Sequence, residues 1–336
     1  MTPNRFLLAV LAGLAACNTC QAAGLFDSDA VLEVALKGPL TAVIRDDEHR
    51  GERSFSLELD GVTVPVAVRL RGKSRVEFCS FPPLRLNFAS EEARDTIFDG
   101  QDKLKLVTHC KGPDEYEQNL LEEVLAYRLV NTLTDISIRT RLLRVTYVNT
   151  DKPGAAPITR FGFLIETEKA VADRLGGSPL QIRNLSRKML DVEHSALVFV
   201  FHYLIGNTDW SLVRNFEDDY CCHNSKLVRV GERNYFLPYD FDMSGLVNAR
   251  YAEPQPELRL RSVRTRRYRG YCTEPAAVRK ALRRVVSLRD EIIGEIAEIP
   301  GLTPSNRQRQ QRYLEKFFTL AAKEDKLLKE FERRCL

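Results

Sequence analysis

Four oxygen-bearing side chains in the second half of the sequence have the types and spacing of a divalent-metal and phosphate site. Asp209 and Asn215 lie six residues apart, so one loop can present both side-chain oxygens. A short hairpin can then bring the acidic pair Asp240 and Asp242 beside them. Hard oxygen ligands of this kind suit Mg²⁺ or Mn²⁺, which share their coordination with nucleotide phosphates.

Phosphoryl transfer requires a small set of groups, and the sequence has a candidate for each. An Asp must lie near the attacking hydroxyl, an Asn and an Asp must hold the metal, and a Lys must hold the phosphates. The loop after Gly206 differs by one residue from the common H-R-D-x-x-x-x-N spacing and lacks its His and Arg. The motifs G-x-S-x-G, H-E-x-x-H and the P-loop, which would indicate other chemistries, do not occur in the sequence.

These residues also have structural explanations. An Asp commonly caps a turn or ends a strand, which would account for Asp209, Asp240 or Asp242 taken alone. Their occurrence in order after a helix that ends at Gly206 favours a shared site. Four of the five histidines show no spacing for a metal site and are expected to be structural: His109, His194, His202 and His223.

The elements that must position the site fall into two halves. Alternating β-branched and apolar residues predict strands in the first half, at 31–43, 53–59, 62–70, 84–88, 103–107, 141–148 and 160–166. Apolar residues at helical spacing predict helices at 117–133, 189–205, 276–296 and 305–334, and a hairpin is predicted at 226–230 with 235–238. This order predicts two lobes with a cleft between them.

Longer motifs around these residues carry a resemblance to a known family. In the second half they are Gly206-Asn207-Thr208-Asp209-Trp210, Asn215, Cys221-Cys222-His223-Asn224 and Pro238-Tyr239-Asp240-Phe241-Asp242. Upstream they are Arg71-Gly72-Lys73-Ser74-Arg75, 103–107 and 122–127. Over roughly 66–242 the sequence resembles the spore-coat protein H-like (CotH) family of atypical protein kinases and, more distantly, the HipA-like kinases.

The resemblance implies a bilobal protein-kinase-like fold of the α+β class, with a strand-rich N-lobe at 23–168 and a helical C-lobe at 169–336 with C-terminal helices. It also implies ATP with Mg²⁺ (or Mn²⁺) and transfer of phosphate to a protein hydroxyl. Asp209 matches the catalytic Asp of the family. The metal-binding positions match Asn215 and Asp242, with Asp240 as the alternative to Asp242.

The same resemblance implies a set of phosphate-binding residues. Lys105 is expected to grip the phosphates with Glu123 as its helix partner, and Arg85 and Glu122 are the alternatives. The sequence departs from the family at the glycine-rich loop, where Gly72 stands nearly alone. Basic residues are expected to hold the nucleotide there instead: Arg71, Lys73 and Arg75.

The N-terminus, residues 1–22, reads as a signal peptide. Arg5 precedes an apolar run at 6–16, which has the length of a signal-peptide core and is too short to span a bilayer. Cys20-Gln21-Ala22 offers a cleavage site, while Leu14-Ala15-Ala16-Cys17 is a rival lipobox that would attach the protein to a membrane through Cys17. A buried helix is a third alternative. We expect export to the periplasm or the extracellular space, as a free protein or as a lipoprotein.

Cysteine numbers agree with export. Cleavage after Ala22 leaves six: Cys79, Cys110, Cys221, Cys222, Cys272 and Cys335. An even number in an exported chain suggests disulfides. We expect the pair Cys79–Cys110, because both residues flank strands of the proposed N-lobe, and different partners for Cys221 and Cys222.

The charge of the chain says little about its partners. The net charge of +4, from 50 basic and 46 acidic residues, does not predict a nucleic-acid partner. The basic run at 259–269 fits a solvated segment as well as one that faces a substrate or phosphate.

Nucleotide is scarce outside the cytoplasm, which is an objection to catalysis by an exported protein. The alternative is a catalytically silent kinase-fold protein with a binding or structural role in the envelope. Retention of Asp209, Asn215 and Asp242 together favours catalysis.

Overall fold

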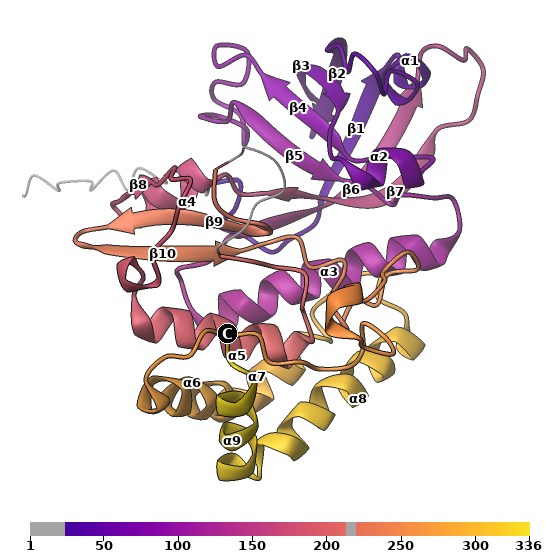
Figure 1. Ribbon diagram of the computed structural model, residues 1–336. Helices are drawn as coiled ribbons and strands as arrows, with labels where there is room; N and C mark the ends of the chain where they lie inside the picture. Colours follow the sequence, from indigo (N-terminus) through magenta and orange to yellow (C-terminus); the bar gives the residue numbers. More distant parts are fainter. Residues whose placement is uncertain (1–23, 213–219) are drawn as a thin grey trace, which may run out of the picture.

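The structure is a computed structural model that describes residues 24–212 and 220–336 (Figure 1). A closed barrel has the strand order β1-β2-β3-β4-β5-β7-β6. Its strands are β1 (Leu32–Gly38), β2 (Arg53–Leu59), β3 (Val62–Leu70), β4 (Leu84–Phe88), β5 (Lys103–Val107), β6 (Thr140–Asn149) and β7 (Ile158–Ile165). A second sheet, in the order β10-β9-β8, consists of β8 (Ser178–Pro179), β9 (Ser225–Val230) and β10 (Arg233–Pro238).

Nine α-helices occur in the described ranges. They are α1 (Leu40–Ile44), α2 (Ser74–Phe78), α3 (Asp114–Leu133), α4 (Glu168–Arg174), α5 (Val192–Ile205), α6 (Pro275–Ser287), α7 (Arg289–Gly294), α8 (Pro304–Ala321) and α9 (Glu324–Arg334). Within those ranges, none of the helices combines the length and apolar character needed to cross a membrane. The predicted signal peptide at 1–22, with Cys17, lies outside the described residues.

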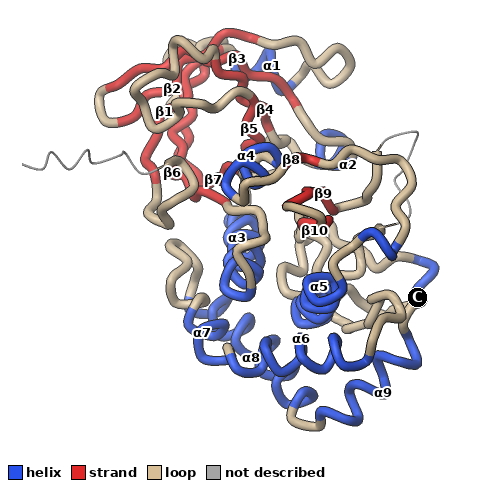
Figure 2. The backbone as a smooth tube through the Cα atoms, turned by 90° about the vertical axis from the view of Figure 1, so that its left-hand side faces the viewer, coloured by secondary structure: helices blue, strands red, loops and turns tan. Residues whose placement is uncertain are grey.

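The expected bilobal protein-kinase-like fold is wrong for this chain, because the first half forms a closed seven-stranded barrel of mixed strand orientation. Strand β1 closes it. It pairs antiparallel with β2, where Ala35 lies opposite Glu58, and parallel with β6, where Val34 lies opposite Val145. Figures 1 and 2 show the barrel above α3 and the β9–β10 hairpin, with α6, α8 and α9 at the far end.

Strand periodicity decides which side chains face the site. Leu84 and Leu86 of β4 and Leu104 and Leu106 of β5 are buried in the barrel core. Because successive strand residues point to opposite faces, the side chain of Lys105 lies on the outside of the barrel. A separate, larger apolar core joins α3 and α5 to the C-terminal helices.

Several predicted boundaries needed correction. The strand expected at 31–43 ends at Gly38, since Pro39 offers no N–H for a sheet hydrogen bond, and α1 follows. The helices expected at 276–296 and 305–334 are each broken, into α6 with α7 and into α8 with α9. The predicted end of α5 at Gly206 is confirmed, because that residue is a left-handed C-cap with φ of 64°.

Three disulfides occur in the described ranges. The expected pair Cys79–Cys110 is confirmed. The expectation of different partners for Cys221 and Cys222 is wrong, because these neighbours are bonded to each other. Cys272 and Cys335 form the third pair, where the C-terminal Leu336 returns to accept a backbone hydrogen bond from Cys272.

Candidate functional site

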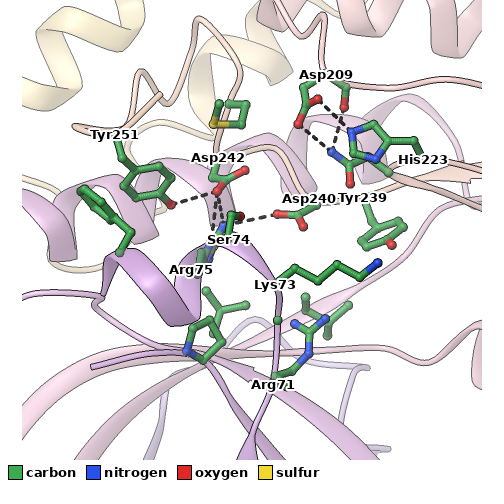
Figure 3. Close-up of a pocket in the computed structure, with 17 residues that line it drawn as sticks. Arg71, Lys73, Ser74, Arg75, Asp209, His223, Tyr239, Asp240, Asp242 and Tyr251 are labelled. Carbon is green, nitrogen blue, oxygen red and sulfur yellow. Dashed lines mark hydrogen bonds and ion pairs between the residues drawn. The ribbon is translucent and has the colours of Figure 1, made fainter. Parts of the chain in front are cut away.

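A cavity of about 330 Å³ lies between the barrel and the segments that follow α5 and β10 (Figure 3). Its barrel side is the connection between β3 and β4, which carries Arg71, Lys73 and Arg75. Gly72 turns this connection with φ of +96°, a value that suits a residue without a side chain. The opposite side carries Asp209, Asp240 and Asp242, so the chain brings three of the four predicted oxygen ligands to one cavity. Asn215 lies outside the described residues.

Asp209 is fixed in place by the residues around it. The backbone N–H of Asp209 donates a hydrogen bond to Asn207 Oδ1 at 2.9 Å. His223 Nε2 lies 2.8 Å and Gln255 Nε2 lies 3.1 Å from its Oδ1, while Asn224 Nδ2 donates to its Oδ2 at 3.0 Å. Burial raises the pKa of the carboxyl, but the hydrogen bonds from His223 and Gln255 outweigh burial, so the net pKa is below its usual value. Asp209 is therefore an ionised hydrogen-bond acceptor.

None of these four partners of Asp209 was predicted as a site residue, although Asn207 and Asn224 lie within the quoted motifs. His223 was expected to be structural, although its place in the Cys221-Cys222-His223-Asn224 motif was an available signal. Gln255 had no sequence signal, since it reaches Asp209 from 46 residues away. Arg269, from the basic run at 259–269, donates to Gln255 Oε1 at 2.9 Å and so supports the same network.

The side chain of Arg75 reaches from the barrel side of the cavity to the acidic residues opposite. Its Nε and Nη2 atoms lie 3.0 Å and 2.7 Å from Asp242 Oδ2. The same Nη2 lies 3.1 Å from Glu123 Oε2 and 3.3 Å from Asp240 Oδ1. Tyr251 also donates to Asp242 Oδ2, at 2.9 Å. One guanidinium thus joins three carboxylates that come from α3 and from the segment after β10.

One positive charge does not balance three carboxylates. Burial is the main reason that the pKa of Glu123 is raised, and Asp242 and Asp240 add repulsion that Arg75 only partly offsets. Burial and the neighbouring Asp242 raise the pKa of Asp240 as well. The side chains of Glu123, Asp242 and Arg75 are only 3%, 10% and 13% exposed, so solvent screens these interactions weakly.

The described residues do not fit the expected divalent metal. Within the described ranges no group of three or more His, Cys, Asp or Glu side chains could hold an ion. Arg75 and Tyr251 already bind Asp242 Oδ2, and Arg75 also binds Asp240. The guanidinium of Arg75 is therefore the cation that these carboxylates bind.

The expected contact between Lys105 and Glu123 is not formed in the described parts of the chain. Glu123 binds Arg75 instead. Lys105 lies in a neighbouring cavity with its Nζ 4.9 Å from the ring centre of Tyr239, and Arg85 lines the same cavity. The alternative Glu122 points elsewhere, where Arg309 and Gln310 donate to its Oε1 at 2.5 Å and 2.6 Å.

The cationic side of the first cavity faces Tyr239 and Asp240. Burial lowers the pKa of Arg71, and the charge of Asp240 partly restores it. Figure 3 shows Lys73 extended along the same side, toward Tyr239. A phosphate in this cavity would contact Arg71 and Lys73 on one side, and the ionised carboxylate of Asp209 would lie across from them.

Comparisons with known proteins do not test the resemblance to the CotH family, which stays a prediction. No protein-family model matches this sequence, and no curated protein matches it with significance.

Proposed function

We propose that the chain is a phosphotransferase, which moves the γ-phosphoryl group of ATP to a hydroxyl of a protein substrate. One observation carries the proposal: the ionised Asp209 faces the cationic connection with Arg71 and Lys73 across a single cavity. The motif resemblance to the CotH family points to the same reaction. The barrel is no obstacle, because chemistry is decided by the groups at a site and not by the fold that carries them.

The residues present can support transfer in defined roles. Arg71 and Lys73 would hold the phosphate oxygens and offset their charge. Asp209 would orient the acceptor hydroxyl and take its proton as the oxygen attacks the γ-phosphorus. The bond from that phosphorus to the β,γ-bridging oxygen breaks, and ADP leaves with the electron pair. His223 and Gln255 would keep Asp209 ionised and oriented.

A second candidate is a binding or structural protein of the cell envelope that holds a phosphorylated ligand without transfer. The contacts of Arg75 favour it, because they occupy the carboxylates that a metal-dependent transferase would need. Both candidates share the phosphate-binding side of the cavity and differ only in what Asp209 does.

Export is proposed for either candidate. Three disulfides agree with an oxidising compartment, where such bonds persist. Detection of the mature protein outside the cytoplasm, with an N-terminus after Ala22 or at a lipidated Cys17, tests this part of the proposal directly. Recovery of the chain from the cytoplasm with residues 1–22 intact would refute it.

Nucleotide binding is tested by thermal unfolding of the disulfide-intact protein in the presence of ATP, once with Mg²⁺ and once without it. A ligand that binds only the native state must raise its stability, by about 2.7 kcal/mol at a hundredfold excess over the dissociation constant. We expect stabilisation by ATP that the double variant Arg71→Gln/Lys73→Gln loses. An unchanged melting temperature at millimolar ATP, in both conditions, would eliminate the phosphotransferase.

A further inference from the structure

A further cavity of about 390 Å³ lies where the first turns of α3 and α8 meet the segment 248–252 (Figure 1). None of the residues that line it in the described ranges lines the first cavity. The two cavities are neighbours along the chain, because Arg250 and Ala252 line this one and Tyr251 lines the first. We call it the amide cavity, after the side-chain amides among the residues that line it: Gln118, Asn119, Asn248 and Asn306.

Two of these amides hold the walls of the amide cavity together. Gln118 Oε1 accepts hydrogen bonds from the backbone N–H of Thr303 and from Asn306 Nδ2, both at 2.9 Å. Asn119 Oδ1 accepts a hydrogen bond from the backbone N–H of Arg250 at 3.3 Å. Helix α3 thus binds both α8 and the segment that carries Arg250. The walls are therefore fixed before a ligand arrives, which limits the entropy lost on binding.

The other two amides keep groups available for a ligand. Asn306 is only 7% exposed, and Gln118 occupies its Nδ2, whereas its Oδ1 accepts no hydrogen bond from the described residues. Asn248 has a left-handed backbone with φ of 50°, and its side chain forms no hydrogen bond within the same ranges. A third group is Arg309 Nε, which is buried without a partner in the described parts of the chain. Because buried polar groups are almost always hydrogen-bonded, these three groups indicate a polar ligand.

Charges around the amide cavity are already paired within the protein. Arg250 Nη2 lies 3.2 Å from Glu115 Oε1, and Arg309 Nη2 lies 2.5 Å from Glu122 Oε1. A charged ligand would have to compete with these partners. Among the described residues that line the cavity, only two alanines have apolar side chains, so an apolar group would gain little by binding there. The ligand that fits is neutral and rich in hydroxyl groups.

We propose that the amide cavity binds a neutral carbohydrate, whose hydroxyl groups are recognised by Asn248, Asn306 and Arg309. A hydroxyl both donates and accepts, so one hydroxyl can donate to Asn306 Oδ1 while its neighbours on the sugar ring accept from Asn248 Nδ2 and Arg309 Nε. A polypeptide main chain is also neutral, but its apolar side chains would need surface that the described lining does not offer. The inference goes beyond the proposed function, since it requires neither ATP nor Asp209.

Saturation-transfer NMR of the disulfide-intact chain with neutral disaccharides tests the proposal, with maltose, lactose, mannobiose and N,N′-diacetylchitobiose as the probes. We expect saturable transfer to at least one of them. Asn248→Gly should weaken the binding of that sugar about tenfold, because it removes a hydrogen bond while glycine accepts the left-handed backbone. Ala252→Trp should abolish binding, because the larger side chain fills the cavity.

Asp60→Gly is the matched control for Asn248→Gly, since Asp60 is an exposed residue with the same φ of 50° between β2 and β3. It should bind sugar like the wild type, and far-ultraviolet circular dichroism checks that each variant is folded. Absence of transfer to every probe, or wild-type affinity in both Asn248→Gly and Ala252→Trp, would overturn the carbohydrate site. Binding of tetraglycine in place of every sugar, with the same loss in Asn248→Gly, would also overturn it, because the cavity would then recognise a polypeptide.

Discussion

Arg75 binds one oxygen of Asp242 through two nitrogens, with Nε at 3.0 Å and Nη2 at 2.7 Å from Oδ2. The two residues are 167 positions apart in the chain. The contact therefore joins α2, in the connection between β3 and β4, to the segment that follows β10. Arg75 also offsets part of the negative charge of the cavity, because Glu123 and Asp240 bind the same guanidinium.

Loss of Arg75 should destabilise the fold and expose a cation site. We expect Arg75→Met to lower the free energy of unfolding by about 3–5 kcal/mol, the usual result of leaving buried charges without their partner. Because the carboxylates then lack a counterion, Mn²⁺ should recover part of the loss in the variant and have little effect on the wild type. Urea denaturation with and without Mn²⁺ measures both effects.

Arg144→Met is the control for this experiment, since the exposed Arg144 pairs only loosely with Glu33 at 3.9 Å. It should change stability little. Equal stabilisation of the wild type and Arg75→Met by Mn²⁺ would show that Arg75 does not take the place of a metal ion.

The sequence predicted the parts of this site that depend on short-range patterns. The helix end at Gly206, the hairpin before Asp240 and the place of Asp209 after α5 all follow from local signals. Contacts between distant segments could not be predicted in this way. The parallel pairing of β1 with β6 closes the barrel across more than a hundred residues, and no local pattern specifies it.

The same limit explains the error about Glu123. Its assignment to Lys105 came from a resemblance in the order of elements, whereas burial and charge in the folded chain place Arg75 beside it. The connection from 71 to 75 was predicted to be basic and near phosphate, but nothing local indicates that Arg75 turns toward the carboxylates while Arg71 faces Tyr239.

Gly206, the C-cap of α5, should be required for the stability of the fold. An alanine there would adopt a left-handed backbone, which costs about 1–2 kcal/mol, and its Cβ would meet the Tyr313 hydroxyl, which adds about 1–3 kcal/mol of overpacking. Gly231→Ala is the matched control, because Gly231 also has a positive φ but has open space around it. Chemical denaturation should therefore rank Gly206→Ala well below Gly231→Ala in stability. Equal stability would disprove the close contact with Tyr313.

Anion binding near Lys105 should weaken as pH rises through neutrality. The pKa of this lysine is lowered from 10.5 to about 7 in the folded chain, so its charge is present below that pH and lost above it. The groups that face it are Arg71, Arg85, Lys226, Glu168 and Asp240. Sulfate is the suitable probe, since its own charge stays constant over this range.

We expect sulfate affinity to be higher at pH 6 than at pH 8.5, and Lys105→Gln to remove most of that difference. Titration calorimetry at the two pH values makes the comparison. A pH dependence that persists unchanged in the folded Lys105→Gln protein would assign the titrating group elsewhere.

The most direct test of the phosphotransferase is transfer of a labelled γ-phosphoryl group to protein hydroxyls. We predict that the wild type incorporates label from ATP and that Asp209→Asn does so about 100–10,000 times more slowly, as expected for loss of a general base. Asp173→Asn, a change at an exposed carboxylate of α4 that pairs with Lys169, should label like the wild type. Equal labelling by Asp209→Asn and the wild type, or ATP binding without labelling in either protein, would contradict the proposed role of Asp209.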